Sequence, residues 1–185
     1  MKSLSQYISE KLIIRKRESN NYKYHPETKE ELKDIILNRI KDEGNKVDLN
    51  DIDVSKIADM SDLFKGTNFN GDISRWDVSN VKNMSYMFHG CQSFNQDISA
   101  WDVSNVTDMH NMFADCENFN VDISKWDISS LRNVKTMFSY CGRFNQDLSS
   151  WDLSKVRVNE ISGMFYKCPI ENRFKPKPYN PNMHM

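Results

Sequence analysis

Residues 94–116 read FNQDISAWDVSNVTDMHNMFADC, and this stretch decides the fold because the chain repeats it. Nearly the same residues occupy 69–91 and 119–141, each displaced by 25 positions. The recurring tryptophans keep this spacing throughout; they are Trp76, Trp101, Trp126 and Trp151. Similar copies at a fixed period indicate stacked repeats, in which each copy buries its apolar side against the next.

Each copy carries two apolar patterns, which together predict a strand followed by a helix. Ile98, Trp101 and Val103 fit the strand signature L-x-x-L-x-L of leucine-rich repeats. The apolar residues that follow are spaced as on one side of an amphipathic helix, which Ser104 can cap: Val106, Met109, Met112, Phe113 and Cys116. Counting a degenerate first copy, we expect parallel strands at residues 49–54, 73–78, 98–103, 123–128 and 148–153.

The sequence therefore predicts the α/β fold class, as a leucine-rich-repeat-type solenoid of about five strand-helix coils with an N-terminal helical cap. Stacking is required, because one copy buries too few apolar side chains to offset its loss of conformational entropy. The expected division is a helical cap and linker at 1–47, the solenoid at 48–170 and a proline-rich tail at 171–185.

The cap is expected to contain two helices. Ser3 and Gln6 match a capping box at the start of the first. The second begins after Pro26 and stops at Gly44. We expect the second helix to cover the open end of the first repeat with its apolar residues Leu32, Ile35, Ile36 and Ile40.

The repeat unit F-N-x-D-I-S-x-W-D-V-S-N-V-x-x-M-x-x-M-F-x-x-C resembles the BspA-like leucine-rich repeat of bacterial surface proteins, lipoproteins and some phage-encoded proteins. The resemblance covers residues 49–170. It implies a right-handed solenoid used for adhesion or protein binding, and it brings no catalytic residues. Because the first residues do not form the apolar block of a secretory signal, we expect a cytoplasmic protein, cellular or phage-associated.

Composition excludes several partners and settings. Lys and Arg number 25 against 26 Asp and Glu, so the chain has no basic excess for tracking nucleic-acid phosphates. No stretch reaches the roughly 18 apolar residues of a membrane span. In a reducing compartment, the four cysteines should be free thiols.

Three recurring polar or sulfur positions invite a site but have a simpler explanation in folding. The carboxylates beside the tryptophans can hold a cation or stabilise a helix start, and we expect the second; they are Asp77, Asp102, Asp127 and Asp152. The recurring asparagines, such as Asn95, should satisfy backbone groups in the turns. The cysteine row can form disulfides or bind metal, but we expect small buried core residues, and neither a metal nor a cofactor.

No catalytic motif appears, so we expect a non-enzymatic module that binds a protein partner through positions that vary between otherwise similar copies. The expected binding residues are Arg75, Lys125, Tyr86, His110 and Tyr140. Arg75 and Lys125 should lie on one surface, where they suit paired acidic groups on the partner. The alternative function is a structural part of a larger assembly, a phage particle or surface layer, attached through the first helix.

Overall fold

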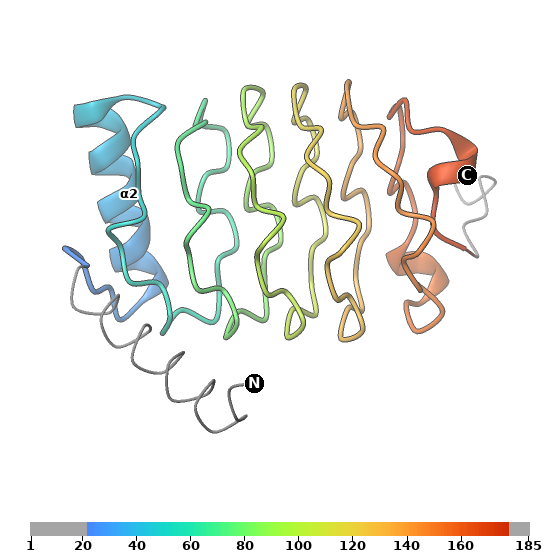
Figure 1. Cartoon of the computed structure of the whole chain (residues 1–185), viewed down its shortest axis with the longest axis horizontal. Helices are drawn as coiled ribbons and strands as arrows, with labels where there is room; N and C mark the ends of the chain where they lie inside the picture. The colour runs from blue at the N-terminus through green and yellow to red at the C-terminus, as the bar shows by residue number, and fades with distance from the viewer. Residues whose placement is uncertain (1–21, 178–185) are drawn as a thin grey trace, which may run out of the picture.

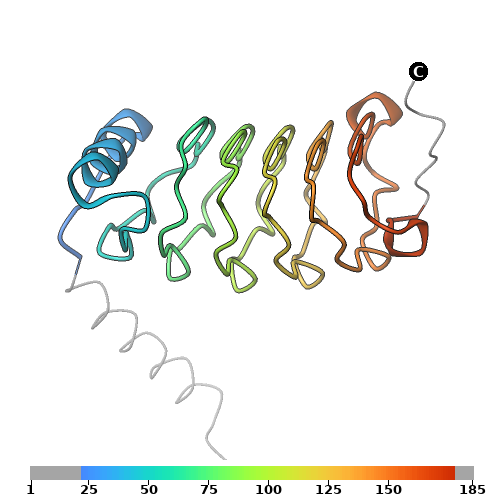
Figure 2. The same ribbon diagram turned by 90° about the horizontal axis from the view of Figure 1, so that it is seen from above.

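The chain winds into a row of stacked coils that a helix covers at one end (Figure 1). The computed structural model describes residues 22–177. Each repeat copy makes one turn around a shared interior, and successive turns lie side by side along the row (Figure 2). The first to the fifth coil comprise residues 49–72, 73–97, 98–122, 123–147 and 148–174.

The predicted α/β fold class is wrong, because the coils contain neither the expected strands nor the expected helices. Among residues 22–177, the regular elements are one α-helix, α2 (Lys29–Glu43), and two short 3-10 helices, η2 (Val158–Glu160) and η3 (Asn172–Phe174). Within the same range, neighbouring coils are joined by isolated parallel bridges, such as Asn83 with Asp108. Each coil is therefore built from turns joined by short extended segments.

The stripe that predicted a helix is a series of turns. In the second coil, Met87 N donates to Met84 O at 3.2 Å and Cys91 N donates to Phe88 O at 2.9 Å. Tyr86 has a φ of 57°, a left-handed conformation that does not fit a right-handed helix. Apolar residues three positions apart therefore lie at the ends of successive turns. The same spacing occurs along one side of a helix, which is why the two could not be told apart in the sequence.

The predicted strands are interrupted by turns of the same kind. Trp101 N donates to Ile98 O at 3.2 Å, and Val106 N donates to Val103 O at 2.9 Å. These bonds bend the chain at the corners of the coil, so the L-x-x-L-x-L residues do not form one extended strand. The pattern correctly predicts which side chains point inward, but it does not predict which backbone hydrogen bonds form.

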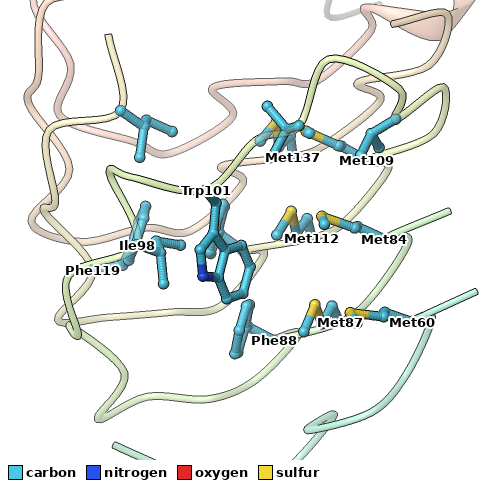
Figure 3. Close-up of a cluster of buried hydrophobic side chains, with 14 of the residues drawn as sticks. Met60, Met84, Met87, Phe88, Ile98, Trp101, Met109, Met112, Phe119 and Met137 are labelled. Carbon is cyan, nitrogen blue, oxygen red and sulfur yellow. The ribbon is translucent and has the colours of Figure 1, made fainter. Parts of the chain in front are cut away.

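Phenylalanine rings stack in columns through the interior. The ring of Phe113 lies 5.7 Å from that of Phe88 and 5.7 Å from that of Phe138, nearly parallel to both. Methionines of successive coils lie in rows opposite Trp101 and Phe88, as Figure 3 shows for Met84 and Met109. This side-by-side packing joins the coils into one core.

The recurring tryptophans are buried in this core, as predicted, with 3–4% of each exposed. Trp101 stacks on Trp76 at 6.4 Å between ring centroids, and its Nε1 donates to Ile73 O of the preceding coil at 3.2 Å. The indole thus contributes both apolar area and a satisfied hydrogen bond between coils.

The cysteines belong to the same interior. Cys91, Cys116 and Cys141 are buried free thiols, and the Sγ of Cys116 donates to Phe88 O of the preceding coil at 2.9 Å. Burial raises the pKa of the Cys91 thiol to about 12 and that of the half-buried Cys168 to about 11. The prediction of small core residues is confirmed for the three buried thiols.

We predict that a thiol reagent at pH 8 modifies Cys168 first in the native protein. The three buried cysteines should react more than about a hundred-fold more slowly in the native protein than in denaturant. The reason is that the thiolate is the reactive form, and burial disfavours it. Mass mapping of the labelled positions over time checks this. Fast labelling of Cys116 in folded protein would contradict the packing described.

The aspartates beside the tryptophans do not cap helices, which corrects that prediction. Ser104 N and Ser104 Oγ instead donate to Asp102 Oδ1 at 3.1 Å and 2.6 Å, an Asx turn. Such serine bonds lower the pKa of several carboxyls below the ordinary 3.8; these are Asp72, Asp97, Asp122, Asp127, Asp147 and Asp152.

We predict a loss of stability in acid. A carboxyl with a pKa lower in the folded than in the unfolded chain stabilises the fold above its unfolded pKa, and this contribution disappears as the pH falls through the folded pKa. The melting temperature should therefore fall between about pH 5 and about pH 2. A variant with Ser99→Ala and Ser149→Ala should show a shallower fall, and an equal melting temperature at both ends of this range would contradict the prediction.

Helix α2 closes the first coil, as predicted for the second helix of the cap. Thr28 Oγ1 accepts a hydrogen bond from Glu31 N at 3.2 Å, and the helix ends at Gly44, whose φ is 89°. Leu32 and Ile36 are fully buried against the coils. The predicted first helix lies outside the described residues.

The far end of the stack is partly covered by residues 171–177, which end the fifth coil and continue beyond it. Leu148 N donates to Phe174 O at 2.8 Å, and Asp152 forms a parallel bridge with Lys177. Pro176 is buried there. Residues 171–177 thus continue the stack along one side.

Candidate interaction surface

One side of each coil forms the connection to its neighbours. In residues 84–90, every second amide donates to the next coil, including Met84 N to Asp108 O at 2.9 Å and Phe88 N to Met112 O at 3.0 Å. The corresponding segments of the other coils are 60–66, 109–115, 134–140 and 161–167. We call the outward side of these segments the ladder face.

The outward residues of the ladder face differ from coil to coil. Elsewhere the repeat keeps F-N, D-[IL]-S and W-D in almost every copy. On the ladder face, one outward position holds in turn Asp62, Tyr86, Asn111, Thr136 and Gly163. A neighbouring position holds Lys65, His89, Ala114, Ser139 and Tyr166, of which Ala114 and Ser139 are buried. Residues that repeat serve every coil alike, so specificity has to come from those that do not.

A third outward position adds a conformational argument. It has left-handed φ values of 52–73° in all coils and is occupied by Gly66, Gly90, Asp115, Tyr140 and Lys167. A residue other than glycine costs about 1–2 kcal/mol in this conformation. The first two coils show that glycine satisfies the fold. Tyr140 and Lys167 are thus held in a conformation that costs the fold more than glycine would.

An aromatic cluster occupies the ladder face of the second and third coils. The Tyr86 ring meets the His110 ring edge-on at 4.7 Å and the His89 ring at 5.6 Å. Lys65 Nζ lies over the Tyr86 ring, 4.4 Å from its centroid. His110 Nδ1 is 2.7 Å from Asp108 Oδ1. These contacts hold the tyrosine in a fixed orientation at the surface.

A second cluster lies on the fourth and fifth coils. The rings of Tyr140 and Tyr166 are 5.4 Å apart at a steep angle, and each is 43% exposed. Lys167 Nζ lies 4.9 Å from the centroid of Tyr140. Two large exposed aromatic residues beside a cation make this the most accessible apolar part of the ladder face.

The predicted binding residues fall into two groups. Tyr86 and His110 are in contact, and Tyr140 lies on the same face two coils away. Arg75 and Lys125 are exposed in the turns before their tryptophans, outside the ladder segments. The structure does not unite them with the aromatic clusters, and their role stays a prediction.

Sequence reasoning missed Lys65, Asp115, Glu117 and Lys167. A signal for two of them was present, because Asp115 and Lys167 align with Gly66 and Gly90. A position that alternates between glycine and polar residues indicates a left-handed turn whose side chain points outward. Reading this stripe as a helix hid that signal.

The chain matches, over residues 36–134 and 68–175, the family described as "Mycoplasma protein of unknown function, DUF285". The chain belongs to this family. The match covers α2 in part and all of the coils, so the stacked coils are what the DUF285 family model describes here. No curated protein and no solved structure was found to match the chain.

Two further features bear on function. No helix within residues 22–177 is long and apolar enough to cross a membrane. Within the same residues, no three or more His, Cys, Asp or Glu side chains gather as a metal site would require.

Proposed function

We propose that the chain is a non-enzymatic protein-binding module and that the ladder face is its binding surface. The observation that carries this proposal is the contrast within each coil: the residues that build the coil repeat, whereas the outward ladder residues vary and include strained Tyr140 and Lys167. The resemblance of the repeat unit to BspA-like repeats, which serve in adhesion and protein binding, supports the same function.

The side chains of the ladder face suit protein recognition. Tyrosine buries much area on binding at a low cost in side-chain entropy, and it is enriched among residues that dominate binding energy. Here Lys65 and His110 pack against Tyr86, so its ring is oriented before a partner arrives. Such preorganisation reduces the entropy lost on association.

The alternative function, a structural part of a larger assembly, predicts self-association. Helix α2 covers the first coil, with Leu32 and Ile36 buried against it. Copies therefore cannot extend the stack at this end without displacing α2. The mass of the purified protein in solution separates the two functions, because a monomer supports the binding module and an oligomer supports the assembly.

The binding function is tested by exchanging residues between coils. Tyr86→Asn with His110→Ser introduces residues that the chain already carries at the equivalent positions, Asn111 and Ser85. Capture of the partner by immobilised full chain should fall about ten-fold or more, since loss of a central tyrosine costs about 2 kcal/mol or more. The melting temperature should change little.

A second variant, Arg75→Glu with Lys125→Glu, changes the two predicted binding residues that lie exposed outside the ladder segments. Its melting temperature should change little, because exposed charges contribute little to stability, and a fall in capture shows that these two residues contact the partner as well. Loss of capture in this second variant, with full capture by the Tyr86→Asn and His110→Ser variant, would move the binding surface to the turns before the tryptophans.

A further inference from the structure

A groove of about 700 Å³ runs along one edge of the ladder face, from the second coil to the fifth. Its walls include Asp115, Glu117, Tyr140 and Lys167. Asp115, Tyr140 and Lys167 hold equivalent positions in successive coils. A carboxylate, a phenol ring and an ammonium group therefore follow one another at about the 4.8 Å spacing of paired chains.

One end of this groove already holds a cation. Lys167 Nζ lies 4.9 Å from the centroid of the Tyr140 ring and 5.6 Å from that of Tyr166. The face of an aromatic ring attracts cations, and more strongly where water is excluded. The Tyr140 ring thus already makes one cation–π contact, with the chain's own Lys167.

The other end is negative. Glu117 has no ion pair among residues 22–177, and Asp115 Oδ2 faces His89 Nδ1 at 3.8 Å, a pair that is ionic only when the imidazole is protonated. A methyl group on Gly142 would overlap the Glu117 carboxylate, so this carboxylate lies directly over the backbone of the next coil. Asp and Glu also outnumber Lys and Arg across residues 48–154.

We propose that the groove takes a basic side chain of a polypeptide partner, with the cation held between the Tyr140 ring and the carboxylates of Asp115 and Glu117. The inference rests on the proposed function and adds the chemistry of the partner. Arginine fits best, because its planar guanidinium stacks on an aromatic face and donates paired hydrogen bonds to a carboxylate. An unpaired carboxylate beside an exposed ring offers both contacts.

The probe is the peptide acetyl-Gly-Arg-Gly-Arg-Gly-amide, titrated into the full chain and followed by NMR. The expected result is binding that shifts resonances of Glu117, Tyr140 and Gly142. Glu117→Gln should weaken binding about ten- to hundred-fold, as loss of a charge-assisted hydrogen bond does. The same peptide with citrulline in place of arginine keeps the shape, lacks the charge, and should not bind.

Two variants serve as controls. Glu30→Gln removes an exposed carboxylate on α2, outside the groove, and should leave the affinity unchanged. Gly142→Ala displaces the Glu117 carboxylate without removing its charge, and it should weaken binding if the position of that group matters. Both variants keep the aromatic clusters intact.

Equal affinity for the arginine and citrulline peptides would overturn the inference, as would an unchanged affinity of Glu117→Gln. Binding of Ca²⁺ at Asp115 and Glu117 without binding of the arginine peptide would also overturn it. If any of these three results occurs while Tyr86→Asn with His110→Ser still loses the partner, the proposed function stands and the basic-side-chain groove is wrong.

Discussion

Replacing Trp101 with alanine should lower the free energy of unfolding by about 3–5 kcal/mol, the usual loss for a large aromatic residue in a core. Trp101 is 4% exposed and packs against two rings of the preceding coil, 6.4 Å from Trp76 and 6.4 Å from Phe88. The variant also loses the hydrogen bond to Ile73 O. A cavity in a central coil cannot close without shifting the coils on both sides.

The same change at Trp151 should cost less. Its Nε1 is buried without a hydrogen-bond partner in the described residues, and its ring is tilted by 47° against Phe138, whereas the equivalent angle is 30° for Trp101 and Phe88. Trp151 also borders a cavity of about 220 Å³ and lies in the last coil, where stacks fray. Urea unfolding of both variants tests the difference. Equal and small losses would show that the tryptophans do not hold the coils together.

Tyr140→Gly should separate folding from binding. Removing the side chain from a left-handed backbone stabilises the fold by about 1–2 kcal/mol. The greater flexibility of glycine in the unfolded chain and the lost ring contacts with Tyr166 and Lys167 offset this gain. Stability should therefore stay within about 1 kcal/mol of the original. Partner capture should fall roughly thirty-fold, as for loss of an exposed tyrosine at the centre of an interface.

The matched control for the strain is Gly90→Ala, at the equivalent position two coils earlier. A Cβ there would meet the Gly66 Cα at 3.7 Å, an ordinary contact, so a change in stability reports the backbone conformation alone. Because Gly90 has a φ of 73°, the free energy of unfolding of the variant should fall by about 1–2 kcal/mol. A neutral Gly90→Ala would remove the argument that Tyr140 and Lys167 are retained for binding.

The repeat spacing predicted that the copies stack and that their tryptophans are buried, and Pro26 with Gly44 predicted the helix that closes the first coil. Each of these predictions depends on side-chain polarity or on local signals at the ends of a helix. The secondary structure within the coils could not be predicted in the same way. Met84 and Met87 are three positions apart, a spacing that fits a turn as well as a helix. The turn forms because the amide of Met84 donates its hydrogen bond to Asp108 O of the next coil, a contact that the local sequence does not reveal.

The candidate surface was predictable in part for a similar reason. Variation between copies identified Tyr86, His110 and Tyr140, because it is visible in the sequence. The grouping of Tyr86 with Lys65 depends on contacts between neighbouring coils, which an assumed helix places wrongly. The separation of Arg75 and Lys125 from the aromatic clusters likewise follows from where the turns fall.

The most direct test of the binding surface is to remove its variation and measure partner affinity. A chain with Tyr86→Asn, His110→Ser, Tyr140→Gly and Lys167→Gly carries at each position a residue found there in another coil. We predict a melting temperature equal to or above that of the original and a loss of affinity of at least about a hundred-fold by surface plasmon resonance. Unchanged affinity in this folded variant would contradict the claim that the ladder face binds the partner.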